Sequence, residues 1–214
     1  RHPHIPQPRD LFDGSRLSAQ GMDISDPLVQ QQLAAGMQAA GDLEYNPKPL
    51  VAAGFNGMDA LEKNIVRNPA NRQEHVGSYY KTNELLVEHV LDAAEQAQFA
   101  WQCVDVKQRA GLFTKAADLL EARTEQFMYL AVKEAGKTWQ DAIDEVREAV
   151  DFLRYYAHCA VHDLCPQIMP GPTGEHNELS YHGRGVLFCI SPWNFPLAIF
   201  CGQICAALVA GNVV

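Results

Sequence analysis

The residue most suited to take part in a reaction is Asn194, in the segment Ser191-Pro192-Trp193-Asn194-Phe195-Pro196. A carboxamide donates hydrogen bonds without titrating, so with a backbone N–H it can stabilise an oxyanion that develops during a reaction. The two prolines restrict the backbone and would hold the amide in place. The alternative is that Asn194 caps a following helix, and the residue types alone leave both interpretations open.

The elements around this segment predict where it lies. Residues 186–190 are all apolar, which favours a buried strand covered on both faces of a parallel sheet. The apolar run after Pro196 predicts a helix. Strand, tight loop and helix form the first half of a dinucleotide-binding unit, and ligands of such sheets gather beyond the carboxyl ends of the strands. Neither GxGxxG nor GxxxxGK[ST] occurs, so ordinary pyrophosphate binding and P-loop chemistry lack support.

A helix predicted over residues 139–161 is rich in acidic side chains, and a solvated face is the simple explanation. Glu148 is the candidate exception. It lies one turn from Asp144 and Phe152, so it can point along the wall of a cavity. His158 and His162 are the one i, i+4 histidine pair, without an HExxH glutamate, and no metal site is predicted.

Upstream, two β-branched or aromatic runs around an Asn-Pro turn predict an antiparallel hairpin over residues 63–81. Apolar stripes then predict a layer of helices capped by Thr82 or Asn83, by Asp105 and by Thr124. A strand is predicted at 178–181. Prolines recur through residues 1–49, which favours an arm or linker rather than a packed layer, with one short helix over 27–40 capped by Ser25 or Asp26.

Composition excludes several classes. The chain has 214 residues and a net charge of −9, which disfavours nucleic-acid binding, and no apolar run reaches the roughly 18 residues of a membrane span. Six cysteines without a CxxC pair and no recognisable signal peptide predict free thiols in a cytoplasmic protein.

The chain starts at Arg1 and stops within an apolar segment, so we expect an internal piece of a longer protein.

Residues 185–200 (GVLFCISPWNFPLAIF) with 210–214 (AGNVV) resemble the aldehyde dehydrogenase superfamily. Residues 134–138 (EAGKT) with 145–157 (EVREAVDFLRYYA) are similar, more narrowly, to the L-glutamate-γ-semialdehyde (pyrroline-5-carboxylate) dehydrogenase module of bifunctional proline utilization A proteins. That similarity runs from about Lys63 to Val214. Residues 9–12 (RDLF) and 21–25 (GMDIS) resemble the connection after the proline dehydrogenase domain of that family.

The resemblance implies an α/β fold of the aldehyde dehydrogenase type. A mostly helical N-terminal layer and a hairpin would lead into the first strand, loop and helix of an incomplete Rossmann-type NAD-binding sheet. Residues 1–62 would be an arm or linker after a proline dehydrogenase domain that is missing here, and residues 63–214 the N-terminal part of the aldehyde dehydrogenase domain.

The resemblance also implies an NAD-dependent oxidation. A cysteine thiolate attacks the aldehyde, hydride passes to NAD, and a glutamate-assisted water releases the acid. Asn194 matches the oxyanion donor, and Phe195 an aromatic wall of the aldehyde tunnel. Glu148 matches a tunnel position that meets the polar end of the semialdehyde. The positions that match the cofactor-binding loop are Ile190, Ser191, Pro192 and Trp193.

Other parts of the family's active site have no match here. The family's cofactor-binding lysine should follow shortly after Val214, and its nucleophilic cysteine and glutamate base further on, so none of the six cysteines is assigned as nucleophile. We expect the chain alone to be inactive, the parent to be a homo-oligomer, and FAD to bind only to the proline dehydrogenase part. The alternatives are another small-aldehyde dehydrogenase, such as one for succinate semialdehyde, and a non-catalytic helical interaction module.

Overall fold

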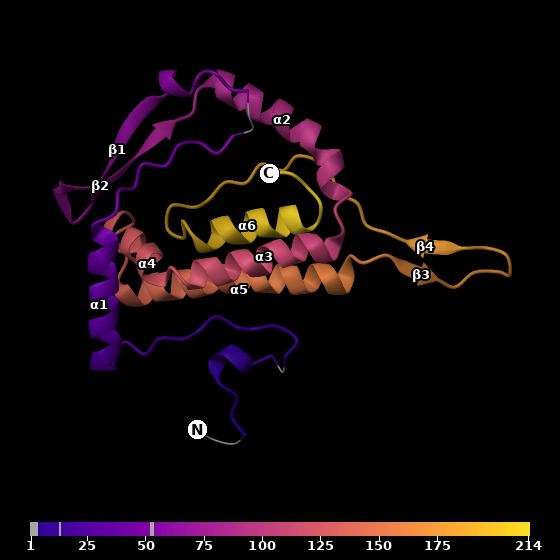
Figure 1. Ribbon diagram of the computed structural model, residues 1–214, viewed down its shortest axis with the longest axis horizontal. Coiled ribbons are helices and arrows are strands. Elements are labelled where there is room, and N and C mark those ends of the chain that lie inside the picture. The colour runs from indigo at the N-terminus through magenta and orange to yellow at the C-terminus, as the bar shows by residue number, and fades with distance from the viewer. Residues whose placement is uncertain (1–3, 13, 52–53) are drawn as a thin grey trace.

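The computed structural model describes residues 4–12, 14–51 and 54–214. A layer of three helices, α3, α5 and α6, forms its centre, and α1 lies across one end of that layer beside α4 (Figure 1). In chain order the elements are η1 (Pro8–Asp10), α1 (Pro27–Gly41), η2 (Met58–Ala60), β1 (Glu62–Asn68), β2 (Asn71–Lys81), α2 (Glu84–Gln102), α3 (Val106–Glu121), α4 (Thr124–Lys133), α5 (Trp139–Asp163), β3 (Gln167–Met169), β4 (Asn177–Leu179) and α6 (Ala198–Val209).

The long helix α5 organises the core. Ile143, Val146, Val150 and Leu153 recur at helical spacing, and all four are buried against α3, α4 and α6. The helix predicted over 139–161 is therefore confirmed. α6 is apolar around most of its circumference, as a helix within a core should be, and packs on α5.

Side-chain caps fix the starts of several helices. The carboxylate of Asp26 accepts from the amide of Leu28, Asn83 caps α2 through the amide of Leu86, and Asp105 caps α3. The prediction that Thr124 caps a helix is wrong. Thr124 is the first residue of α4, and its hydroxyl donates to the carbonyl of Glu121 at 2.7 Å, so it closes the end of α3 instead.

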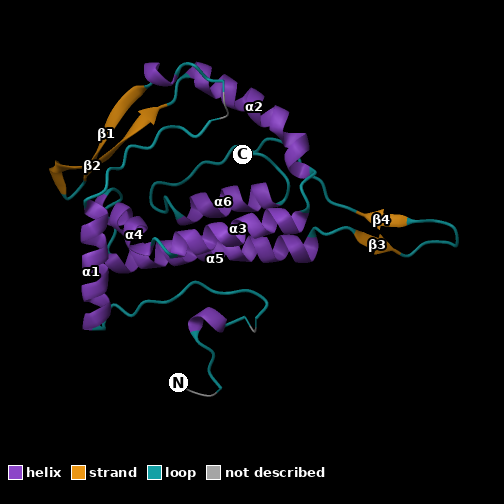
Figure 2. Cartoon of the chain, viewed as in Figure 1, coloured by secondary structure: helices purple, strands orange, loops and turns teal. Residues whose placement is uncertain are grey.

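Two hairpins lie on opposite sides of the helical layer (Figure 2). The predicted hairpin over 63–81 is confirmed as β1 and β2, whose turn is closed by Asn68 accepting from the amide of Ala70. The strand predicted at 178–181 is confirmed only over its first residues, in β4. Its partner β3 was not predicted, because the nearby prolines and glycines indicated a loop.

The buried strand predicted over residues 186–190 is wrong. The segment makes one parallel bridge, from Val186 to Val213, and Phe188 and Ile190 are 88% and 70% exposed. A strand of a parallel sheet needs hydrogen-bonded neighbours and helices on its faces. Among the described residues, the bridge to Val213 is the one strand pairing of this segment, and its large apolar side chains Phe188 and Ile190 stay exposed.

The interpretation of residues 1–49 as an arm outside any packed layer is also wrong in part. Leu33, Met37 and Ala40 of α1 are buried in the main core, and Ala19 joins them. Residues 1–3, 13 and 52–53 of the predicted arm lie outside the described part of the chain.

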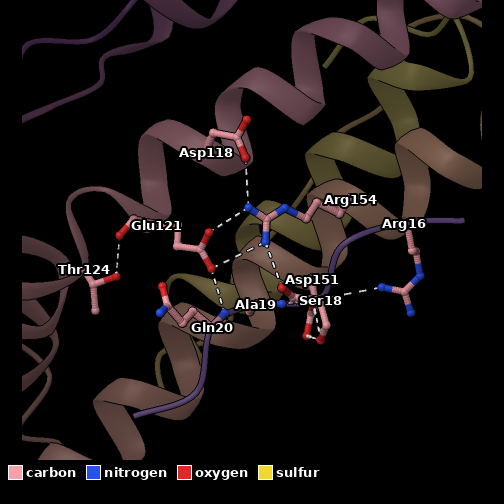
Figure 3. Close-up of polar contacts among 9 residues, drawn as sticks. All are labelled: Arg16, Ser18, Ala19, Gln20, Asp118, Glu121, Thr124, Asp151 and Arg154. Atoms are coloured by element: carbon pink, nitrogen blue, oxygen red, sulfur yellow. Dashed lines mark hydrogen bonds and ion pairs between the residues drawn. The ribbon is translucent and has the colours of Figure 1, made fainter. Parts of the chain in front are cut away.

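Segment 16–20 is fastened to α3 and α5 by a polar cluster (Figure 3). Arg154, which is 4% exposed, donates to the carbonyl of Ser18 and to the carboxylates of Asp118 and Glu121 at 2.8 and 2.7 Å. The amide of Ala19 donates to Asp151 at 2.8 Å. The arm thus pairs its backbone with the side chains of two helices.

We expect Arg154→Met to lower the free energy of unfolding by about 2–3 kcal/mol near neutral pH, because two carboxylates lose their partner. Although burial raises the pKa of Glu121, the hydrogen bonds from Arg154 and Gln20 outweigh it and hold that pKa below its usual value. Glu121 therefore contributes stability that is present above its unfolded-state pKa and is lost as pH falls through its folded-state pKa.

The loss of unfolding free energy in Arg154→Met should accordingly be smaller at acidic pH. Urea denaturation at neutral and acidic pH measures this difference. Arg147→Met is the matched control, since Arg147 is a partly exposed arginine of the same helix, 3.9 Å from Asp144. It should change stability by no more than about 0.5 kcal/mol. A deficit that is independent of pH would contradict the assigned role of Glu121.

Candidate functional site

The segment 191–196 forms an exposed loop between the extended residues 184–190 and the start of α6. Trp193 is 88% exposed and Asn194 is also exposed, so neither side chain is used in the core. The hydroxyl of Ser191 donates to the carbonyl of Pro196 at 3.3 Å and ties the two ends of the loop together. The side-chain carboxamide of Asn194 is therefore exposed in a loop whose two ends are held together.

The alternative role of Asn194, as the cap of the next helix, is wrong. The N-cap residue of α6 is Leu197, and its side chain makes no capping hydrogen bond. The amides of Leu197 and Ala198 instead donate to Oε1 of Glu145, at 3.0 and 2.8 Å. Asn194 is therefore not needed for the local fold, which leaves its carboxamide available for a ligand.

Glu145 departs from the solvated acidic face that the sequence predicts for its helix. It is 1% exposed and reaches across to α6. Its Oε2 lies 2.6 Å from Nζ of Lys137, and that Nζ lies 4.7 Å from the centre of the Phe195 ring. One sequence signal was available, because Ala142 and Ala149 lie three residues before and four residues after Glu145 and place it beside the apolar face of the helix.

Glu148, the predicted tunnel residue, is exposed on α5, three positions after Glu145. Phe195 is partly exposed and lies beside the ion pair of Lys137 and Glu145. The structure therefore brings Phe195 and Asn194 together in one loop. Among the described residues, no hydrogen bond or ion pair joins Glu148 to that loop. The roles of these residues remain predictions.

A groove of about 630 Å³ lies between residues 187–190 and α6. Ile190 and Phe188 line one side, and Gln203 and Ala206 line the other. A cavity of about 680 Å³ between β2, α4 and the segment around Tyr45 contains none of the predicted site residues. The groove beside the loop is consequently the relevant concave surface.

Two of the cysteines are deeply buried in α6. Burial, with a smaller contribution from the nearby Glu145 carboxylate, raises the pKa of Cys201 to about 11. Burial raises the pKa of Cys205 to about 12. Both stay protonated near neutral pH, and a thiol is a poor nucleophile in comparison with a thiolate.

Neither a metal cluster nor a membrane-spanning helix occurs among the described residues. No group of three or more histidine, cysteine, aspartate or glutamate side chains in residues 4–12, 14–51 and 54–214 has the arrangement of a metal site. No helix in that part of the chain is both long and apolar enough to cross a membrane.

The helical layer, the hairpin and the loop before α6 belong to a known class of proteins. The sequence profile described as "Aldehyde dehydrogenase family" matches residues 57–214. The chain belongs to the aldehyde dehydrogenase family, as the resemblance predicted.

Individual relatives narrow the comparison. The bifunctional protein PutA of Salmonella typhimurium is 39% identical over 217 residues, covering 100% of this chain and 15% of that protein. The 1-pyrroline-5-carboxylate dehydrogenase of Anoxybacillus flavithermus is 40% identical over 168 residues, covering 78% of this chain and 32% of that protein. The solved 1-pyrroline-5-carboxylate dehydrogenase from Thermus with bound NAD has a TM-score of 0.81 at 30% identity, over 89% of this chain and 37% of that one.

The chain therefore spans only a small part of the relatives that it matches. Its similarity to them confirms the predicted fold class, a partial α/β domain of the aldehyde dehydrogenase type, although the first strand of the predicted sheet is not formed.

Proposed function

We propose that this chain is the N-terminal portion of the dehydrogenase domain of a PutA-like bifunctional enzyme, which oxidises L-glutamate γ-semialdehyde to glutamate with NAD. The observation that carries the proposal is the extent of the match. In sequence, PutA relatives align with 100% of the chain, including residues 1–56 outside the family profile, whereas the 1-pyrroline-5-carboxylate dehydrogenases align with 69% to 78% of it. The solved Thermus enzyme superposes on 89% of the chain, which is still less than the PutA relatives cover.

The same proposal assigns the two parts of the chain. Residues 1–62 connect to a preceding proline dehydrogenase domain, where FAD would bind, and residues 63–214 begin the aldehyde dehydrogenase domain. A cytoplasmic, homo-oligomeric parent enzyme is part of the proposal.

Asn194 is the group of this chain that acts on the reacting atoms. When a thiolate from elsewhere in the enzyme adds to the aldehyde carbon, the carbonyl oxygen becomes an oxyanion. The Nδ2 amide of Asn194 donates a hydrogen bond to that oxygen and lowers the energy of its developing charge. A bound NAD would supply the acceptor for the hydride that leaves the same carbon.

The described residues fit only part of an NAD site. Ile190 is exposed and lines the groove along α6, and Trp193 is exposed in the loop that follows; exposed apolar side chains suit contact with flat, weakly polar rings. The first turn of α6 does not suit a pyrophosphate, because the amides of Leu197 and Ala198 are already bonded to the Glu145 carboxylate. The diphosphate must be held by other groups, in keeping with the missing GxGxxG motif.

The role of Glu148 gives a test of substrate class. A carboxylate at the tunnel attracts the α-ammonium group of glutamate semialdehyde, a group that propanal and succinate semialdehyde lack. In the full-length enzyme, Glu148→Gln should raise KM for glutamate semialdehyde roughly tenfold and change KM for propanal little.

Steady-state kinetics with both aldehydes measure this difference. Asp144→Asn, which alters an exposed carboxylate one turn earlier on α5, should affect neither KM. Equal changes for the two aldehydes in Glu148→Gln would contradict the assignment and leave Glu148 as part of the charged helix face.

A further inference from the structure

We propose that Lys137 and Glu145 form a positioning pair, which fixes the loop bearing Asn194 by capping α6 from a neighbouring helix. The inference rests on the proposed function, because the loop matters for catalysis only if Asn194 stabilises the oxyanion. Neither residue contacts the reacting atoms in this proposal.

The first support is the start of α6. A helix begins with amides that lack intrahelical partners, and this helix has no side-chain cap of its own. Ala198 is fully buried, so water cannot replace a missing partner there. Oε1 of Glu145 accepts from both Leu197 and Ala198, and its negative charge lies at the positive end of the helix dipole.

The second support is the burial of the carboxylate. A buried charge is costly unless it is paired, and Lys137 supplies the partner at 2.6 Å while its own side chain is only 13% exposed. Lys137 is itself held in place, because its amide donates to the carbonyl of Ala131 and the preceding Gly136 has a φ of +69°. Such a φ favours glycine and sets the turn between α4 and α5.

The third support is that both members of the pair contact the chain shortly after Asn194. The Lys137 ammonium group lies 4.7 Å from the ring centre of Phe195, the residue immediately after Asn194, within the range of a cation–π interaction. Glu145 holds the backbone at Leu197, three residues after Asn194. Loss of the pair would let the loop shift, and a displacement of about 1 Å at a catalytic group can lower a rate roughly 100-fold.

The test compares Glu145→Ala, Glu145→Gln and Lys137→Met in the full-length enzyme. Hydrogen exchange followed by mass spectrometry would report on the amides of Leu197 and Ala198, and kinetics with glutamate semialdehyde would give kcat and both KM values. Lys133→Met is the matched control, because Nζ of Lys133 pairs at 2.8 Å with Oε1 of Glu74, which lies on β2.

In Glu145→Ala we expect exchange at Leu197 and Ala198 to be at least about tenfold faster. We expect kcat to fall roughly 100-fold, with KM for NAD within about twofold of the wild-type value. Glu145→Gln keeps an acceptor for the two amides and should recover about tenfold of the lost kcat, which a general loss of packing would not allow. Lys133→Met should match the wild type in every measurement.

Unchanged exchange in Glu145→Ala would overturn the proposal, and so would faster exchange with an unchanged kcat. If the single variants do not fold, the double variant Lys137→Met/Glu145→Gln removes both charges at nearly constant volume, and a wild-type kcat in it would likewise overturn the pair's role. A wild-type enzyme with no aldehyde oxidation would contradict the proposed function instead, and the exchange rates would still show whether the pair holds the loop.

Discussion

Asn194→Ala in the full-length enzyme is expected to lower kcat by a factor on the order of 10²–10³. The variant loses a hydrogen bond that strengthens as charge develops on the aldehyde oxygen, so the loss falls on the transition state. KM for NAD should change little. Because Asn194 is exposed and does not cap α6, the free energy of unfolding should stay within about 0.5 kcal/mol of the wild-type value.

The measurement is a comparison of kcat and thermal unfolding between the wild type and two variants. Asn194→Asp is the matched control, because it keeps the size of the side chain and replaces the donor amide by a carboxylate that repels an oxyanion. It should be at least as slow as Asn194→Ala. A kcat within about twofold of the wild-type value in either variant would contradict the assigned role.

The second large effect concerns residues 1–214 expressed alone. We expect no measurable NADH formation, at least on the order of 10⁶-fold below the full-length rate, because the family's thiolate and base are not assigned to any residue of this segment. Cys201 and Cys205 are protonated and buried near neutral pH. Cys159 is distant from Glu145, which caps α6 next to the loop with Asn194, because it lies 14 residues further along α5, or about 21 Å along the helix axis.

The assay would contain excess NAD and glutamate semialdehyde, with the full-length enzyme as the positive control. A folded state of the isolated segment would be checked by circular dichroism, so that an inactive sample is not simply unfolded. Steady NADH production by the purified segment would contradict the proposal that the nucleophile lies elsewhere in the enzyme.

Local signals made the helices and the first hairpin predictable from sequence. Asp26, Asn83 and Asp105 cap helices because a short polar side chain before an apolar stripe satisfies free amides within its own few residues. The stripe on α5 is equally local. These interactions need no partner from a distant part of the chain, so the sequence pattern alone indicates them.

Features that depend on distant partners could not be predicted in this way. Residues 186–190 have the composition of a buried strand, but a strand forms only beside hydrogen-bonded neighbours, and here the bridge to Val213 is all that the described chain provides. The burial of Glu145 depends on α6 and on Lys137. The attachment of segment 16–20 depends on Arg154, which donates to the carbonyl of Ser18 from 136 residues away in the sequence.

The candidate site was predictable in part. The sequence placed Asn194 in a tight loop before a helix, and the structure agrees; the exposure of that loop is seen only in the structure. The sequence did not predict that Glu145 of α5 caps the start of α6. This cap excludes both the capping role of Asn194 and a pyrophosphate at the first turn of α6.

The central claim is that the full-length enzyme oxidises L-glutamate γ-semialdehyde with NAD. The most direct measurement is the rate of NADH formation with this aldehyde, with succinate semialdehyde and with propanal, together with identification of the acid product by mass spectrometry. We predict glutamate and NADH in equal amounts, and a kcat/KM for glutamate semialdehyde at least about tenfold above the other two. A higher kcat/KM for succinate semialdehyde or propanal, or no NADH with any of the three, would contradict the claim.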